Sequence, residues 1–265
     1  MNAPAALIDI RGLGKTYDEG TRALADVDLD VHRGEFLTLV GPSGCGKSTL
    51  LHIIAGLVEP TSGILTWRAE RGGSAAARPT VGFVFQSPTL MPWARVSTNV
   101  RLPLDLAGVA RGAAERAVAT ALERVRMTKF AGHLPRQLSG GMQMRTSIAR
   151  ALVVEPDVLL MDEPFGALDE FTRQRLDAEL LALWSSQQMT VIFVTHSIHE
   201  AVFLSTRVVV MAAQPGRILD AWDVDAPFPR GEAFRLSPEF ASHAQRLSAC
   251  VAAAGSDALP DDIAA

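Results

Sequence analysis

Short runs of Val, Ile, Leu and Phe recur along the chain, and longer stretches between them repeat apolar residues every three to four positions. Such runs are typical of buried parallel strands, and the stretches between them are typical of helices that cover a sheet. We predict strands at residues 35–40, 81–85, 158–161, 191–194 and 207–211. The pattern therefore predicts an α/β fold with a mainly parallel sheet.

Polar and apolar residues alternate at 7–10 and 25–31, which predicts an antiparallel β edge. Helices are predicted at 47–58, 113–127 and 170–184. In the last of these, we expect one apolar stripe to contain Phe171, Leu176, Leu180 and Trp184.

Strand-like apolar runs stop after Gln86 and resume near residue 155, which predicts an inserted helical subdomain at 87–154. Pro88, Pro92 and Pro103 predict that this segment opens as a loop. We expect one domain over 1–265, with a core at 1–86 and 155–220 and a C-terminal helical extension at 221–265. Ser237 is the expected cap of the last helix.

Composition excludes several classes of protein. The chain has 265 residues, of which 48% are apolar and 20% charged, so disorder is excluded. A formal net charge of -4 disfavours nucleic acid as a partner. Two cysteines are too few for a disulfide framework, and neither a secretory signal nor an apolar run long enough to span a membrane is expected.

A glycine-rich segment follows the strand at 35–40 and precedes the helix at 47–58, which is the context of a phosphate-binding loop. Its residues are Gly41, Pro42, Ser43, Gly44, Cys45, Gly46, Lys47, Ser48 and Thr49. Glycines allow backbone N–H groups to converge on phosphate oxygens, Lys47 is suited to the β and γ phosphates, and Ser48 to Mg²⁺. A glycine-rich turn without a ligand is the plainer alternative.

Polar residues follow three further strands. Asp162 and Glu163 close one strand, Gln86 follows another and His196 a third. Because ligands of parallel α/β sheets bind beyond the carboxyl ends of the strands, we expect these residues to meet the phosphate loop around one nucleotide. Asp162 and Gln86 would then serve Mg²⁺, Glu163 would deprotonate the attacking water and His196 would donate to the γ-phosphate.

A second expected anion site lies at Ser139, Gly140, Gly141 and Met142, which open a helix at about 141–153. An ordinary capped helix is the alternative. About thirteen helical residues at 1.5 Å each separate Ser139 from the strand of Asp162 by roughly 20 Å. A γ-phosphate at Asp162 would therefore meet Ser139 of a second copy of the chain.

Together these motifs resemble those of the nucleotide-binding subunits of ABC transporters, over about residues 7–217. The resemblance implies a P-loop NTPase fold of ABC ATPase type that hydrolyses ATP with Mg²⁺. It also implies a homodimer that sandwiches ATP between the phosphate loop of one subunit and Ser139 to Met142 of the other. Asp169 matches the family's D-loop, and Tyr17 falls where the family stacks a ring on adenine, a core or surface ring being the alternative.

The segments 90–93, 162–172, 195–204 and 215–218 are similar to those of importers of nitrate, sulfonate, taurine, bicarbonate and thiamine-precursor pyrimidines. This similarity implies permease subunits in the membrane, a periplasmic or extracellular solute-binding protein, and a place on the cytoplasmic face of the cell membrane. Met142 replaces the commoner Gln of the family, and the segment 67–80 lacks the usual Asp-Gly turn, so an irregular β edge is expected there. The apolar loop 90–93 would either receive a permease helix or pack inside the helical insertion.

Two other functions fit part of the sequence. A soluble ABC-type ATPase of DNA repair or translation would share the motifs, but such proteins usually add coiled coils, zinc-binding cysteines or a second cassette. A P-loop kinase or GTPase would leave Ser139 to Met142 and His196 without a role. The transported solute is not encoded in this chain, because selectivity lies in the partner chains.

Overall fold

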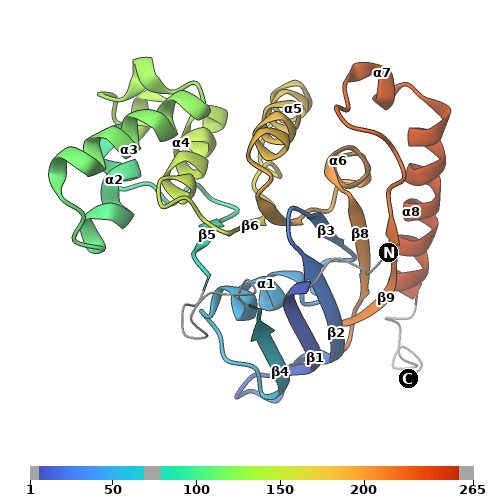
Figure 1. The fold of residues 1–265 in the computed structure, drawn as a ribbon. Coiled ribbons are helices and arrows are strands. Elements are labelled where there is room, and N and C mark those ends of the chain that lie inside the picture. Colours follow the sequence, from blue (N-terminus) through green and yellow to red (C-terminus); the bar gives the residue numbers. More distant parts are fainter. Residues whose placement is uncertain (1–5, 69–78, 257–265) are drawn as a thin grey trace. The chain divides into compact units, whose positions relative to one another are not determined.

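The computed structural model describes residues 6–68 and 79–256, which form two compact units (Figure 1). Unit 1 comprises Met1–Pro79 and Thr190–Ala265, and unit 2 comprises Thr80–Met189. Unit 2 is thus inserted into the sequence of unit 1. The irregular edge expected at 67–80 falls mostly on 69–78, outside the described residues.

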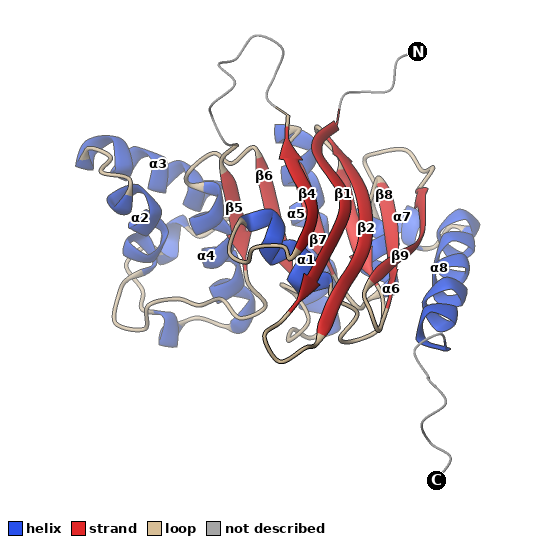
Figure 2. Ribbon diagram, turned by 90° about the horizontal axis from the view of Figure 1, so that it is seen from below, coloured by secondary structure: helices blue, strands red, loops and turns tan. Residues whose placement is uncertain are grey.

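Unit 1 contains an antiparallel sheet of strand order β2-β1-β4, in which the three strands lie side by side (Figure 2). The strands are β1 (Ala6–Thr16), β2 (Arg22–His32) and β4 (Ser62–Trp67). This confirms the predicted antiparallel edge at 7–10 and 25–31. β4 was not predicted, because four of its six residues are exposed and its sequence carries no apolar alternation.

Unit 1 also contains parallel strands in the order β7-β3-β8, with β9 antiparallel to β8. Their bounds are β3 (Phe36–Val40), β7 (Thr190–Val194), β8 (Arg207–Ala212) and β9 (Arg217–Asp223). Every residue of β3 and β7 is buried, as predicted from their continuous apolar runs. β9 was missed because only Trp222 of its seven residues is buried.

Four helices complete the part of unit 1 that the structure describes. They are α1 (Lys47–Ala55), α6 (Ile198–Leu204), α7 (Glu232–Arg235) and α8 (Pro238–Ser256). α8 packs on β8 and on α6 (Figure 1). The Oγ of Ser237 accepts a hydrogen bond from the backbone N–H of Phe240 at 3.1 Å, which confirms the predicted cap.

Unit 2 combines a parallel strand pair with helices. The strands are β5 (Val81–Val84) and β6 (Val158–Asp162). The α-helices are α2 (Val96–Leu106), α3 (Arg111–Arg124), α4 (Gly140–Leu152) and α5 (Glu170–Gln187). Two 3₁₀ turns, η1 (Thr128–Phe130) and η2 (Pro135–Gln137), lie between α3 and α4. The two units thus show the predicted α/β class, with parallel strands, an antiparallel edge and an inserted run of helices.

Two local predictions were wrong. Pro103 lies inside α2 instead of in a loop. It is tolerated close to the helix end, where the missing N–H removes one bond to the Asn99 carbonyl. Phe171 is 87% exposed and does not join the buried stripe of α5. Five positions separate Phe171 from Leu176, and at 100° per residue this turns the two side chains about 140° apart.

Asn99 fixes the loop that opens the helical insertion. Its side chain is fully buried, and its Oδ1 accepts from the backbone N–H of Met91 at 2.7 Å. Its Nδ2 donates to the carbonyls of Met91, Ala94 and Arg95 at 3.0–3.2 Å. One amide therefore satisfies backbone groups on both sides of Trp93, as buried polar groups require.

We predict that Asn99→Ala lowers the free energy of unfolding by about 2–3 kcal/mol, because four backbone groups lose their hydrogen bonds to this side chain. Denaturant unfolding measures this loss. Asn99→Asp is the matched variant, since it keeps the acceptor and turns the donor into an oxygen facing three carbonyls. A free energy within about 0.5 kcal/mol of wild type in either variant would contradict this role of Asn99.

Candidate functional site

The loop from Gly41 to Gly46 connects β3 to α1 through backbone that favours glycine. Gly41, Gly44 and Gly46 have φ angles of 153°, 78° and 89°. A β-carbon on Gly41 would lie 2.3 Å from the Met211 carbonyl oxygen, and one on Gly46 would lie 2.8 Å from the Ala23 carbonyl oxygen. The loop therefore depends on glycine for its conformation at all three positions and for close backbone contact at two.

Lys47 holds its ammonium group inside this loop. The residue is buried, and its Nζ donates to the carbonyls of Gly41 and Pro42 at 2.9 Å each. The Sγ of Cys45 accepts from the same Nζ at 3.5 Å. Burial raises the pKa of the Cys45 thiol, which favours packing over nucleophilic chemistry. A cation at the start of a helix, surrounded by glycine backbone, fits an anionic ligand such as a phosphate chain.

Tyr17 lies beside the helix that the loop starts. Its hydroxyl is 3.4 Å from the Thr49 Oγ1, and the Lys15 Nζ lies 5.2 Å from its ring centroid. The residue is 40% exposed, so it is not a core ring. Its proximity to Thr49 places an aromatic surface near the phosphate loop within unit 1.

His196 follows β7, the parallel neighbour of β3. The register pairs Leu39 with Val194, and the backbone N–H of Thr195 donates to the Leu39 carbonyl at 3.3 Å. His196 is exposed and leaves its strand at the same sheet edge as Gly41. Two of the four expected strand ends therefore meet within unit 1.

The other two strand ends meet within unit 2. Val84 of β5 pairs with Met161 of β6, and the Nε2 of Gln86 donates to the Glu163 Oε2 at 3.3 Å. Asp162, the last residue of β6, is 9% exposed. Glu163 has a φ of 44°, a backbone conformation that residues with a β-carbon rarely adopt. Such local strain is frequent at functional sites.

Ser139 and Asp169 begin helices of unit 2. Ser139 caps α4 by accepting from the Met142 N–H at 3.4 Å, and Asp169 caps α5 by accepting from the Thr172 N–H at 3.0 Å. This hydrogen bond holds the pKa of Asp169 below its ordinary value. Gly140 is exposed beside Ser139, while a β-carbon on Gly141 would lie 2.9 Å from the Thr172 Cγ2. The predicted cap of α4 is confirmed, and Gly141 allows α4 and α5 to pack closely.

The expected site residues thus fall into two groups, each assembled within its own unit. Tyr17, residues 41–49 and His196 belong to unit 1, and Gln86, residues 139–142, Asp162, Glu163 and Asp169 belong to unit 2. The meeting of both groups around one nucleotide stays a prediction. Glu200, whose carboxylate accepts a hydrogen bond from the Thr195 hydroxyl, was not among the predicted residues. A carboxylate in the apolar helix 198–204 was the available signal.

Residues 24–166 match the family model described as ABC transporter. The chain belongs to the ABC transporter family. It is 44% identical over 245 residues to the aliphatic sulfonates import ATP-binding protein SsuB of Bacillus licheniformis, covering 91% of this chain and 92% of that protein. It is 41% identical over 240 residues to the taurine import ATP-binding protein TauB of Rhizobium johnstonii, covering 88% of this chain and 90% of that protein.

Solved structures agree with this assignment. The ATP-binding cassette MJ0796, a dimer bound to ADP and Pi, matches with a TM-score of 0.70 and 31% identity over 83% of this chain and 100% of that one. The structure of cbiO1 from Clostridium perfringens matches with a TM-score of 0.74 and 26% identity, and the match covers 91% of this chain and 99% of that one. The predicted ABC ATPase fold and ATPase activity are therefore confirmed, and a kinase or GTPase is not favoured.

No helix in residues 6–68 or 79–256 of this ABC ATPase is both long and apolar enough to cross a membrane.

We predict that Gly46→Ala lowers the free energy of unfolding by at least about 3 kcal/mol, because the new methyl meets the Ala23 carbonyl in addition to the left-handed strain. Gly44→Ala is the matched control. It has similar φ but open space around the added methyl, so a loss of about 1–2 kcal/mol is expected. Chemical unfolding measures the free energy of unfolding of both variants. Equal losses would show that the close backbone approach at Gly46 does not add to the cost of the substitution.

Proposed function

We propose that this ABC ATPase powers the import of a small anionic or heterocyclic solute through separate permease subunits. The observation that carries this proposal is the identity of 41–44% to the SsuB and TauB proteins over about nine tenths of the chain. Those proteins are named for the import of aliphatic sulfonates and taurine. A soluble ABC-type ATPase of DNA repair or translation is the disfavoured alternative.

ATP would bind with its phosphates on the loop 41–46 and its adenine on Tyr17. Lys47 supports this assignment, because its ammonium already donates hydrogen bonds to two backbone carbonyls at 2.9 Å and would exchange them for phosphate oxygens. The N-terminus of α1 adds a positive dipole at the same place. Ser43, Ser48 and Thr49 add hydroxyl groups to this end of unit 1.

Mg²⁺ would be held by the Ser48 hydroxyl, the Gln86 amide oxygen and the Asp162 carboxylate, directly or through water. Hydroxyl, amide and carboxylate oxygens are the hard donors that Mg²⁺ prefers, so this set of residues fits the ion. The bound ion would neutralise charge on the β and γ phosphates.

Glu163 is the proposed general base and Gln86 its partner. The Gln86 Nε2 donates to the Glu163 Oε2 at 3.3 Å, so the amide lies beside the carboxylate that would act on the water. Glu163 would take a proton from a water molecule while the water oxygen attacks the γ-phosphorus. The bond between that phosphorus and the β–γ bridging oxygen would then break. His196 would donate a hydrogen bond to the γ-phosphate as its charge shifts.

A second copy of the chain would complete each site. α4 has thirteen residues and is capped by Ser139, so it places the exposed Ser139 and Gly140 about 20 Å from the helix end that leads to β6. Ser139 to Met142 would therefore reach the γ-phosphate bound by the partner, with Asp169 beside the same interface. The dimeric MJ0796 structure bound to ADP and Pi supports this arrangement by similarity.

The permease would dock on unit 2, at the cytoplasmic face of the cell membrane. A hollow of about 440 Å³ there is lined by apolar side chains that include Phe85, Leu102 and Leu106. Leu106 and Trp93 are 80% and 78% exposed, so neither is packed inside the helical insertion. A cytoplasmic helix of the permease would cover this apolar surface, and the permease would connect the ATPase to a periplasmic or extracellular solute-binding protein.

We predict that Glu163→Gln suppresses ATP turnover at least about a hundredfold, because the amide cannot take the proton from water. ATP binding should remain within about threefold of wild type. Lys47→Ala is the complementary variant and should weaken binding itself, as a fluorescent ATP analogue would report. Undiminished turnover in Glu163→Gln would contradict its assignment as the base.

We also predict that Glu163→Gln forms a stable dimer when ATP is added, because the bound nucleotide persists at the shared interface. Adding Ser139→Phe should abolish this dimer, since a bulky ring would occupy the place of the γ-phosphate, while each monomer still binds ATP. Sedimentation velocity distinguishes the two states. A dimer that persists in the double variant would show that Ser139 lies outside the interface.

A further inference from the structure

Arg230 is a buried cation in unit 1 whose partners are backbone carbonyls. It is 5% exposed, and its two terminal nitrogens donate five hydrogen bonds of 2.8–3.2 Å. The acceptors are the carbonyls of Val202, Phe203, Ser205, Val224 and Ala226. The guanidinium also lies 4.1 Å from the Phe228 ring centroid. Burial lowers the pKa of Arg230 to about 10, so the group is charged at neutral pH.

Three of these acceptors belong to the end of α6. The last carbonyls of a helix have no partner within the helix and carry partial negative charge, so a cation stabilises them. Val224 and Ala226 lie instead in the segment that follows β9. The buried guanidinium of Arg230 therefore bridges the C-terminal extension and the end of α6.

The start of α6 is joined to His196 by a closed set of hydrogen bonds. The Ser197 Oγ caps the helix by accepting from the Glu200 N–H at 3.3 Å, and the Ser197 N–H donates to the Thr195 Oγ1 at 2.9 Å. The Thr195 hydroxyl in turn donates to the buried Glu200 carboxylate. His196 lies between Thr195 and Ser197, so its backbone is held on both sides by contacts to α6.

α6 has only seven residues, and a helix this short is not stable without tertiary contacts. Besides Arg230, the ring of Phe240 in α8 stacks on His199 of α6, with ring centroids 5.8 Å apart. The position of α6 therefore depends on the C-terminal extension, and the position of His196 depends on α6.

We propose that Arg230 is a positioning residue for ATP hydrolysis: by binding the last carbonyls of α6, it holds His196 in the orientation that meets the γ-phosphate. This rests on the proposed role of His196. It gives the extension after β9 a part in turnover, although none of its residues belongs to the predicted nucleotide site.

Steady-state ATP hydrolysis by Arg230→Met, His196→Ala and the double variant tests this proposal. Arg230→Met should lower kcat at least about fivefold and leave KM for ATP within about twofold, because the phosphate loop is untouched. In the His196→Ala background the same change should lower kcat less than about twofold, since two residues that act through one step are not additive. Circular dichroism at the assay temperature confirms that each variant is folded.

Arg246→Met is the matched control, because Arg246 lies in α8 and contacts Asp220 and Trp222 instead of α6. Its kcat should equal that of wild type. If Arg230→Met is not folded, Arg230→Lys replaces it, since one ammonium cannot reach both α6 and the Val224 and Ala226 carbonyls. Arg230→Lys should lower kcat with unchanged KM and should show the same loss of effect beside His196→Ala.

Three results would overturn the proposal. They are a wild-type kcat in the folded Arg230 variant, an equal loss of kcat in both His196 backgrounds, and an equal loss in Arg246→Met. The first two leave the proposed role of His196 intact, provided that His196→Ala alone lowers kcat. A wild-type kcat in His196→Ala would instead contradict that role and the positioning role together, so the two failures are distinguishable.

Discussion

The close backbone approach at the glycine loop is the constraint on which unit 1 depends. The space that a β-carbon would fill at Gly41 is taken by the end of β8, and at Gly46 by β2. Gly216 makes a third such approach, 2.4 Å from its β-carbon position to the Cys45 carbonyl oxygen. The loop is thus in contact with the antiparallel sheet and with the β8-β9 hairpin at once. Residues without a β-carbon at these points permit that packing and leave backbone donors available to a phosphate.

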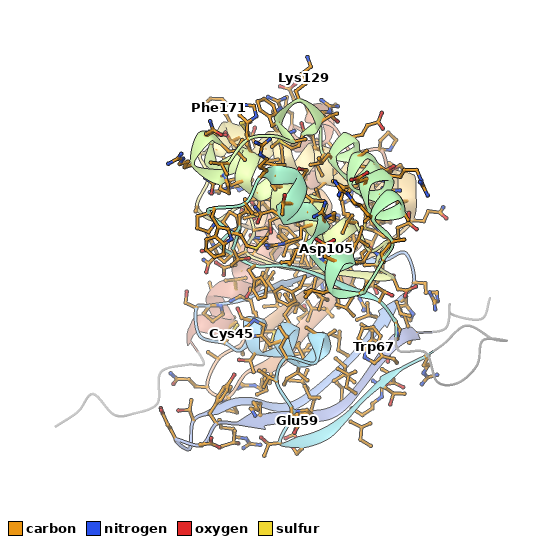
Figure 3. The ribbon with its side chains drawn as sticks, turned by 90° about the vertical axis from the view of Figure 1, so that its left-hand side faces the viewer. Cys45, Glu59, Trp67, Asp105, Lys129 and Phe171 are labelled. Carbon is orange, nitrogen blue, oxygen red and sulfur yellow. The ribbon has the colours of Figure 1, made fainter. Side chains whose placement is uncertain are left out.

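Helix starts recur at the functional positions of both units. Lys47 begins α1, Ser139 caps α4, Asp169 caps α5 and Ser197 caps α6 directly after His196. A helix N-terminus carries free N–H groups and partial positive charge, which suit phosphate. In Figure 3, Cys45 marks the loop of unit 1, and Phe171 marks the outside of unit 2 near the start of α5. The exposed Phe171 follows the Asp169 cap by two residues, so an apolar ring lies next to the proposed interface between copies.

Buried polar side chains hold the loops that connect these helices. Asn99 satisfies the backbone around Trp93, Glu200 holds the backbone around His196, and Arg230 satisfies the end of α6. Asn99 and Arg230 bind backbone groups directly, whereas Glu200 accepts from the Thr195 hydroxyl, which itself accepts from the Ser197 N–H. Polar groups left buried without partners would cost free energy. This explains how irregular segments near the proposed sites keep one conformation without strands or long helices of their own.

The sequence by itself determined the parallel strands, the helix caps at Ser139 and Ser237 and the residues of the candidate site, because burial periodicity and helix-start chemistry are local properties of the chain. Tertiary structure alone decided the exposed strands β4 and β9, the place of Pro103 within α2, and the partners of Asn99 and Arg230. These depend on contacts between residues distant in sequence: Arg230 meets the Ser205 carbonyl across 25 positions. No periodicity records such a contact, since only the folded chain brings a cation to that carbonyl.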